Sequence, residues 1–279
     1  MYQSQLFVKT KKEAPKEAEI VSHKLLTRGD FIEQLASGIY VFLPLGLRVQ
    51  KKIEDIIREE LESIGAQELL MSALQPKILW EKTGRWSTMD PPLLKLKDRH
   101  QKELALGSTH EEVITYIVSR RMENFGDLPI SLFQIQNKFR DEMRATGGLL
   151  RTREFLMKDL YSFHADQKDF DKYYELLKKV YQKIFKRCGL ETIITEASGA
   201  GFFEKPVRLK TTKRVISRAI INPIFNLGEG LILDLLYHTS NGACPVIQPR
   251  TSCLRQLYRG SVLSDSASYY WDIIINLEA

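Results

Sequence analysis

Helical spacing is the clearest pattern of hydrophobic and polar residues in this chain. Residues 45–64 carry apolar side chains three or four positions apart with charges between them, at Leu47, Ile53, Ile56, Ile57 and Leu61. This spacing predicts a long amphipathic helix that packs on one face. Residues 166–188 repeat the pattern and stop before Gly189, so a second amphipathic helix is expected there.

Strand-like segments lie between these helices. Residues 67–74 read as one strand, and residues 131–142 alternate polar and apolar side chains as a half-buried strand does. Residues 151–164 read as another strand, which follows the turn signal Gly147-Gly148. The sequence therefore predicts a long β-hairpin within an α+β fold.

The pattern changes after about Gly201. Charged residues become sparser and helical periodicity is hard to follow, although three stretches are apolar enough to be buried, at 219–226, 230–238 and 269–279. We expect residues 1–200 to form one domain and assign no domain type to residues 201–279.

Composition places the chain among ordinary globular proteins. It has 279 residues, of which 43% are hydrophobic and 27% charged, and a formal net charge of +6. That charge is compatible with a nucleotide or RNA partner but is also usual for a solvated surface. The three cysteines contain no C-x-x-C pair, which disfavours a zinc ribbon or a disulfide framework.

Targeting signals are missing from the sequence. The N-terminal residues lack the apolar core of a signal peptide, and no apolar segment reaches the roughly 20 residues of a membrane span. We therefore expect no membrane association and a cytoplasmic location, with the matrix of an organelle as the alternative.

Candidate chemistry begins at Thr109-His110-Glu111-Glu112, which opens a predicted helix. The simplest interpretation is a capping box, with Thr109 as the N-cap and Glu112 three residues later. Glu111 would then lie in the first helical turn, where it could hold a substrate ammonium group. The second histidine of the metalloprotease H-E-x-x-H motif is absent, and no metal site is predicted.

The predicted hairpin carries a second group of candidates. Arg140 and Glu142 would share one face of a strand, and Arg151 and Phe155 share one parity across the turn. Guanidinium groups suit phosphates, an aromatic ring suits a base, and a carboxylate suits an exocyclic amine, so this face fits a nucleotide. An exposed sheet face with alternating charges fits the spacing equally well.

Longer motifs favour the nucleotide. Arg140-Asp141-Glu142, a loop and Arg151-x-x-x-Phe155 resemble motif 2 of the class II aminoacyl-tRNA synthetases, F-R-x-E, loop, R-x-x-x-F. The segments TGRW, GSTHEEVIT, LPISLFQIQNKFRDE and GLLRTREFLMKDLYSFH resemble the catalytic domain of bacterial-type prolyl-tRNA synthetases. The resemblance covers about residues 1–199 and implies the class II antiparallel sheet flanked by helices.

The resemblance implies a role for each candidate in an ATP site. Arg140 would hold the α-phosphate of ATP and the carboxylate of proline, and Glu142 would read the adenine amine. Arg151 would lie near the distal phosphates, and Phe155 would stack on the adenine.

The resemblance also implies a proline site. Thr109 and Glu111 match the T-x-E loop, within residues 107–112, that binds the imino group. The walls of the proline pocket would be Met157, Tyr161 and His164.

The implied reaction is the ligation of L-proline to tRNA(Pro) through prolyl-adenylate, with ATP and its Mg²⁺ as substrates. Residues 46–72 look like motif 1, which forms a homodimer interface in the family. A non-catalytic synthetase-like module that dimerises or binds nucleotide or proline is the alternative.

Some family features are missing from the match. Met71-Ser72 and Gly107-Ser108-Thr109 stand where the family usually has Met-Pro and Gly-Pro-Thr. Motif 3, the editing insertion and the anticodon-binding domain do not align with residues 201–279, where Gly228-Glu229-Gly230 only superficially suggests a motif 3 glycine. We therefore expect the fold to be incomplete at its C-terminal end.

Overall fold

The computed structural model describes residues 2–196, 207–211, 233–235, 237–238 and 271–274. Its helices, two of them short 3-10 turns, are η1 (Gln3–Gln5), α1 (Val21–Arg28), α2 (Pro44–Glu62), α3 (Lys77–Lys82), α4 (Arg85–Thr88), α5 (Glu111–Arg121), η2 (Phe125–Asp127) and α6 (Gln167–Arg187). The two long helices expected from the apolar spacing, α2 and α6, are confirmed to within a few residues. Helix α6 starts where Asp166 accepts a hydrogen bond from the backbone N–H of Asp169.

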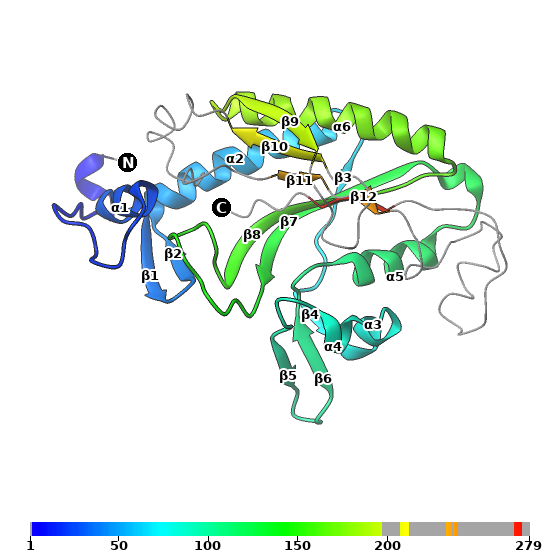
Figure 1. The fold of residues 1–279 in the computed structure, drawn as a ribbon, viewed down its shortest axis with the longest axis horizontal. Helices are drawn as coiled ribbons and strands as arrows, with labels where there is room; N and C mark the ends of the chain where they lie inside the picture. The colour runs from blue at the N-terminus through cyan, green and yellow to red at the C-terminus, as the bar shows by residue number, and fades with distance from the viewer. Residues whose placement is uncertain (1, 197–206, 212–232, 236, 239–270, 275–279) are drawn as a thin grey trace.

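The strands form a central sheet and three smaller ones. They are β1 (Ile32–Ala36), β2 (Ile39–Phe42), β3 (Gln67–Glu68), β4 (Leu74–Pro76), β5 (Lys95–Lys97), β6 (Glu103–Leu106), β7 (Ile130–Phe139), β8 (Glu154–Phe163), β9 (Thr192–Glu196), β10 (Val207–Thr211), β11 (Leu233–Leu235), β12 (Tyr237–His238) and β13 (Trp271–Ile274). The central sheet has the order β12-β13-β8-β7-β3, and the smaller ones are β1-β2, β4-β6-β5 and β11-β10-β9. The fold is α+β, as expected, and Figure 1 shows the long β7–β8 ribbon at its centre.

The predicted hairpin is confirmed but is shorter than expected. Its ladder runs without a break from Ile130 opposite Phe163 to Phe139 opposite Glu154. Beyond Phe139 the chain leaves the ladder for a loop that turns at Gly147 and Gly148, both at positive φ. The prediction that Arg140, Glu142 and Arg151 lie on strands is therefore wrong.

The loop has other partners for its backbone, which explains this early end. The N–H of Arg153 donates to the carbonyl oxygen of Gly38 at 2.8 Å, and its guanidinium donates to the carbonyl oxygen of Ser37 at 2.9 Å. The loop is therefore attached to the β1–β2 hairpin, which Figure 1 shows beside it.

Residues 67–74 form two short strands in different sheets, so the single strand expected there is wrong. β3 pairs parallel with β7, an exception to the antiparallel pairing expected throughout, and β4 pairs with β6. Between them, side chains hold the backbone of Met71: its N–H donates to Gln134 Oε1 at 3.1 Å, and its carbonyl oxygen accepts from Gln136 Nε2 at 2.8 Å. These bonds replace ladder bonds, and the chain crosses from one sheet to the other.

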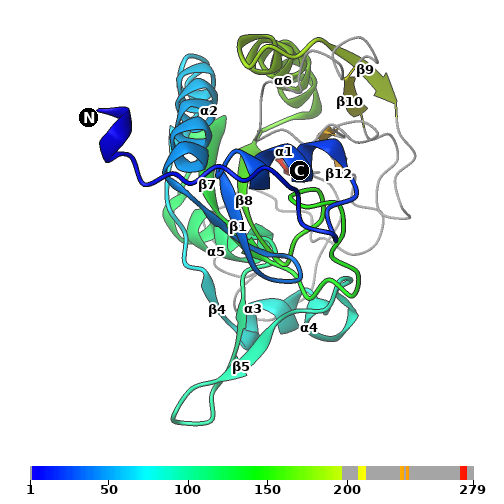
Figure 2. The same cartoon turned by 90° about the vertical axis from the view of Figure 1, so that its left-hand side faces the viewer.

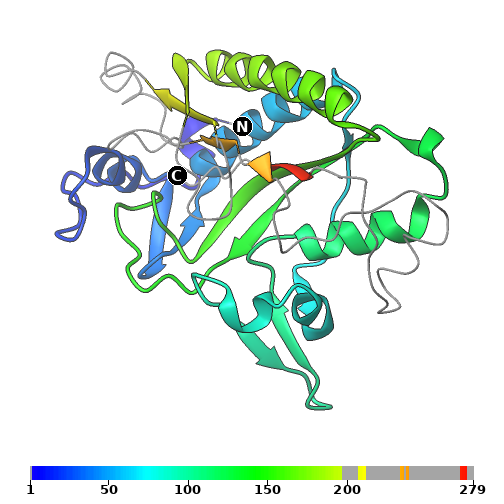
Figure 3. The ribbon, with the colours of Figure 1, turned by 45° about the vertical axis from the view of Figure 1, so that its right-hand side comes forward.

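Helices cover both faces of the β7–β8 ribbon. On one face α2 and α6 pack on Phe133 and Leu160, and on the other α5 packs on Tyr161 and Phe163. Figure 3 shows α2 and α6 on one side of the ribbon and α5 on the other. Both faces are therefore buried at the centre, where Phe133 and Gln134 have no exposed surface, and the half-buried strand expected from the alternation is wrong there.

The β4-β6-β5 sheet carries the chain to the site. Trp80 of α3 is fully buried beside it, with Leu93 and Ala105. Figure 2 shows the β5–β6 hairpin projecting away from the central sheet. Strand β6 ends at Leu106, so the residues that follow enter α5 at the base of this hairpin.

Expectations for residues 201–279 are tested only in part. Residues 219–226, residues 228–230 and the domain boundary near residue 200 lie outside the described residues. Within the apolar stretch 269–279, β13 pairs antiparallel with β8. In the part of the chain that the structure describes, no helix is long and apolar enough to cross a membrane.

Candidate active site

The loop from β6 into α5 holds the T-x-E residues, but its capping differs from the expectation. The N-cap of α5 is His110, which makes no side-chain capping bond. The Thr109 hydroxyl donates to Glu111 Oε2, and the Thr109 carbonyl oxygen accepts from Gln75 Nε2 at 2.9 Å. Thr109 is not the N-cap and the Glu112 carboxylate accepts from another side chain, so the predicted capping box is wrong.

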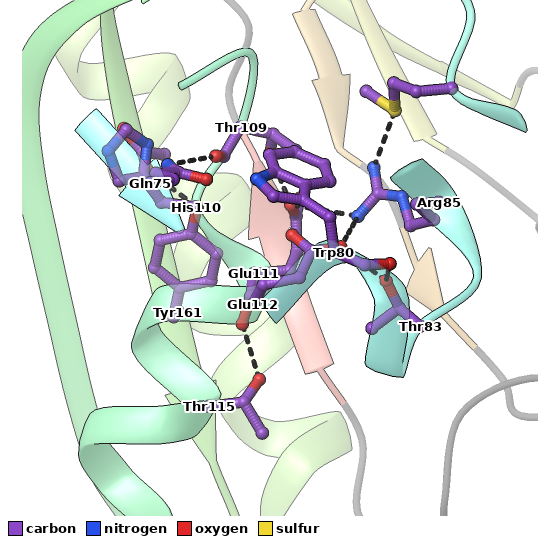
Figure 4. A network of polar contacts seen from close by, with 12 residues as sticks. Gln75, Trp80, Thr83, Arg85, Thr109, His110, Glu111, Glu112, Thr115 and Tyr161 are labelled. Carbon is purple, nitrogen blue, oxygen red and sulfur yellow. Dashed lines mark hydrogen bonds and ion pairs between the residues drawn. The ribbon is translucent and has the colours of Figure 1, made fainter. Parts of the chain in front are cut away.

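That side chain is Arg85, the first residue of α4 (Figure 4). Its Nη1 lies 2.9 Å from Glu112 Oε1 and 3.4 Å from Glu111 Oε2. The Thr83 hydroxyl donates to the same Glu112 oxygen at 3.0 Å, and the Arg85 guanidinium lies over the Trp80 ring at 5.5 Å. One guanidinium therefore joins two consecutive carboxylates at the start of α5.

A buried polar chain supports the loop from the sheet side. Lys138 Nζ lies 2.9 Å from Asp159 Oδ1, and neither side chain is exposed. The other Asp159 oxygen accepts from Gln134 Nε2 at 2.8 Å and from the Tyr161 hydroxyl at 2.7 Å. Lys138 also lies 2.7 Å from His110 Nδ1. An ammonium group has only donors, so Nδ1 accepts and Nε2 donates to the carbonyl oxygen of Ser72 at 3.1 Å.

Burial sets the protonation of these groups. Burial, and then the charge of Lys138, lower the pKa of His110 to about 3. Burial raises the pKa of Tyr161 well above its usual range, so its hydroxyl stays a donor. Burial also raises the pKa of Glu112, and the charge of Arg85 opposes that rise. The His110 ring and the Tyr161 hydroxyl are therefore neutral near pH 7, and the polar chain keeps one hydrogen-bonding pattern.

The candidates on β8 share the sheet face that carries this polar chain. In the ladder Lys138 is opposite Phe155, Gln136 opposite Met157 and Gln134 opposite Asp159, and opposite residues share a face. Met157 and Tyr161 are buried there, and the Tyr161 hydroxyl also interacts with the Thr109 side chain. Two predicted proline-site residues therefore lie on the T-x-E side of the sheet.

Arg140 and Phe155 are brought together although Arg140 lies beyond the strand. The guanidinium of Arg140 lies over the Phe155 ring, 5.2 Å from its centre. The N–H of Arg140 donates to the carbonyl oxygen of Arg153 at 2.9 Å. A cation and an aromatic face therefore lie together at the end of the hairpin where the loop joins its two strands.

Glu142 and Arg151 meet within the loop. Arg151 Nε donates to Glu142 Oε2 at 2.7 Å, and the Arg151 side chain is 57% exposed whereas that of Glu142 is 5% exposed. The Glu142 carbonyl oxygen also accepts from Arg153 Nε at 3.0 Å. The protein itself thus holds the Glu142 carboxylate in place through the bond from Arg151.

His164 lies elsewhere, contrary to its predicted place beside Tyr161. Its Nδ1 is 2.7 Å from Asp169 Oδ2, and its ring packs against Phe170 and Tyr173 at centroid distances of 5.6 and 5.2 Å. All three partners belong to α6. Its position one residue beyond β8 turns the ring toward the α6 layer, away from α5.

Sequence reasoning missed four residues of this cluster: Arg85, Glu112, Lys138 and Asp159. Arg85 was visible only as part of the TGRW segment, and Glu112 only as a presumed cap. Buried charged residues within a strand are unusual, so a charge inside each predicted strand is the signal that could have found Lys138 and Asp159. Pairing them required the register of the hairpin.

The cluster offers an accessible anion for an amine and a cation for an acid group. The Glu111 side chain is 25% exposed and can receive a cationic amine, whereas Arg140 near Phe155 can receive a carboxylate or a phosphate. Among the described residues, no group of three or more His, Cys, Asp or Glu side chains is placed to hold a metal ion.

The comparison with protein families agrees with this geometry. The tRNA synthetase class II core domain (G, H, P, S and T) matches residues 94–246, more than half of the chain. The chain belongs to this family. The matched range of the class II core includes β6, α5, the β7–β8 hairpin and every candidate residue except those of the Arg85 segment.

Among individual proteins, the resemblance to prolyl-tRNA synthetases is confirmed. The proline–tRNA ligase of Caldicellulosiruptor bescii is 54% identical over 194 residues, which are 70% of this chain and 34% of that protein. The proline–tRNA ligase of Geobacillus kaustophilus is 52% identical over 203 residues, 72% of this chain and 36% of that protein. The chain thus spans about a third of the length of the curated relatives it matches.

A solved structure has the same class II fold. It is the prolyl-tRNA synthetase of Cryptosporidium parvum in complex with halofuginone and AMPPNP, with a TM-score of 0.64 at 15% identity. The match covers 78% of this chain and 43% of that one. At this identity the likeness concerns the fold.

Proposed function

We propose that this chain carries the proline-activating site of a proline–tRNA ligase. The observation that carries the proposal is the grouping on one side of the sheet: Thr109 and Glu111 lie beside Tyr161, and Arg140 lies over Phe155. An amino acid needs an anion for its amine and a cation for its carboxylate. The similarity to curated proline–tRNA ligases narrows the amino acid to proline.

In this proposal the imino group of proline binds between Thr109 and Glu111, and Met157 and Tyr161 contact the ring. The carboxylate of proline attacks the α-phosphorus of ATP, which releases pyrophosphate and leaves prolyl-adenylate. The attacking oxygen is already ionised, so no general base is needed. Catalysis consists of aligning the two substrates and stabilising phosphoryl charge, with Arg140 at the α-phosphate.

The remaining ATP contacts are proposed on the loop. Phe155 stacks on the adenine, Glu142 accepts from its amine, and Arg151 and the Mg²⁺ that ATP brings stabilise the distal phosphates. The Glu142–Arg151 contact supports this arrangement because it holds the acceptor carboxylate in place. Transfer of prolyl to tRNA(Pro) completes the reaction.

We also propose a homodimer in the cytoplasm or in an organelle matrix. Residues 46–72 carry the resemblance to a dimer-forming motif, and three leucines of this segment and its continuation are exposed: Leu47 by 38%, Leu70 by 78% and Leu74 by 48%. In the proposed dimer the partner copy would cover exposed leucines of this segment.

Proline-dependent exchange of pyrophosphate into ATP tests the activity, together with calorimetric binding of a non-hydrolysable prolyl-adenylate analogue. We expect both, and we expect Arg140→Ala to abolish the exchange while the far-ultraviolet circular dichroism stays unchanged. Exchange that survives Arg140→Ala would refute the assignment of Arg140. A folded chain that neither exchanges nor binds the analogue would refute the proposed function.

A further inference from the structure

The charged groups around Glu111 leave a net negative charge, which bears on how the site would bind a cation. Glu111 and Glu112 are consecutive carboxylates at the start of α5, and Arg85 is the cation within ion-pair distance of both. The nearby Lys138–Asp159 pair contributes no net charge, whichever partner carries the proton. His110 and Tyr161 are neutral near pH 7. With both glutamates ionised, the group as a whole carries one negative charge.

The Arg85 guanidinium lies closer to one of the two carboxylates than to the other. The same nitrogen, Nη1, is 2.9 Å from Glu112 and 3.4 Å from Glu111, and the nearer carboxylate is the buried one, 1% exposed against 25%. The Thr83 hydroxyl adds a hydrogen bond to Glu112 at 3.0 Å. Arg85 thus makes its shorter contact with the buried Glu112, and Glu111 is the carboxylate on the accessible side.

The rest of the Arg85 environment keeps the guanidinium in this position. Its face lies over the Trp80 ring at 5.5 Å, and its Nη2 lies 3.3 Å from the Met89 sulfur. In Figure 4 the Arg85 group and the Thr109–Tyr161 side lie on opposite sides of the glutamates. Glu112 therefore faces away from the proposed position of proline and cannot act by touching it.

We propose that Glu112 is a positioning residue that retains the Arg85 cation, so that one net negative charge stays at Glu111 for the ring-nitrogen cation of proline. This inference rests on the proposed function. It gives the Arg85–Glu112 pair a part in recognising the amine of the substrate, in addition to the T-x-E residues.

Removal of the Glu112 charge, which does not touch the ligand, should therefore weaken the binding of a cation. In Glu112→Gln, Arg85 has Glu111 as its only carboxylate partner in the group, and the site becomes neutral. A charge change within about 4–6 Å is worth roughly 10- to 1000-fold in the balance between charged and neutral forms. We expect Glu112→Gln to weaken L-proline binding by at least about tenfold.

Two ligands and a double variant separate this effect from damage to the fold. (S)-Tetrahydrofuran-2-carboxylate has the shape of proline with oxygen in place of the cationic nitrogen, so Glu112→Gln should not weaken its binding. Arg85→Gln combined with Glu112→Gln restores the single negative charge and should recover most of the L-proline affinity. Removing both partners of a buried ion pair can also repair the fold, so damage to the fold is excluded by the two ligands together: it would weaken the binding of both.

The experiment is calorimetric titration of the full chain with each ligand, and Glu103→Gln is the matched control. Glu103 is an exposed carboxylate that pairs with Lys77, away from the site, and its substitution should leave both affinities unchanged. The inference is overturned if Glu112→Gln binds L-proline within about twofold of the unsubstituted chain, if both ligands lose affinity equally, or if the double variant is no better than Glu112→Gln. An unsubstituted chain that binds no L-proline would refute the proposed function, and this inference with it.

Discussion

His110 should make this protein sensitive to acid in a way that a single substitution removes. Its ring has no exposed surface and a pKa of about 3, against 6.5 for a histidine in water. Between these pH values the unfolded chain binds one proton more than the folded chain. The free energy of unfolding therefore falls as the pH falls below 6.5, by about 1.4 kcal/mol per pH unit.

The expected size follows from the two pKa values. Between pH 7.5 and pH 4.5 the His110 contribution to the free energy of unfolding should decrease by about 2.5 kcal/mol. His110→Asn retains an acceptor for Lys138, whose ammonium lies 2.7 Å from Nδ1, but it removes the titrating ring. The stability advantage of the unsubstituted chain over this variant should shrink by that amount over the pH range.

Urea denaturation at closely spaced pH values measures the difference. Carboxylates elsewhere titrate in both proteins alike, so their contributions cancel. His100→Asn is the matched control because His100 is exposed, and it should keep the pH dependence of the unsubstituted chain. Parallel curves for His110→Asn and the unsubstituted chain would refute the reasoning that His110 is buried in its neutral form.

Three further changes test other parts of the structure. Lys138→Met leaves Asp159 buried without its ion-pair partner and should cost about 3–5 kcal/mol in urea denaturation, whereas addition of Asp159→Asn should recover part of the loss; a cost below about 1 kcal/mol would contradict the buried pair. Asp166→Ala removes the N-cap of α6 and should cost about 1 kcal/mol, and no change would contradict the capping bond. Leu70→Glu should shift the sedimentation of the proposed dimer toward the monomer, whereas Leu35→Glu, at a similarly exposed leucine outside motif 1, should not.

Local patterns predicted the long elements well. The apolar spacing located α2 and α6 to within a few residues because each helix buries one continuous stripe, at Ile53, Ile57 and Leu61 in the case of α2. The alternation and the glycine pair located the β7–β8 hairpin for similar reasons. These features depend on contacts between neighbours in the sequence, or on burial of one face.

Predictions failed where a distant segment supplied the partner. The strand expected over residues 67–74 is divided because Gln134 and Gln136, more than sixty positions away, bind the backbone of Met71. Arg140 and Glu142 lie in a loop because Arg153 pairs with the β1–β2 hairpin. Spacing within one segment carries no information on such bonds.

The candidate site also has residues that the sequence identified and contacts that only the folded structure shows. The resemblance to family motifs identified Thr109, Glu111, Arg140 and Phe155 as functional candidates, whereas spacing alone left other interpretations open. The ion pair of Lys138 with Asp159, and the position of Arg85 between two glutamates, depend on strand register and on how α4 packs against α5. Buried charges are stable only beside partners, and those partners come together only when the chain has folded.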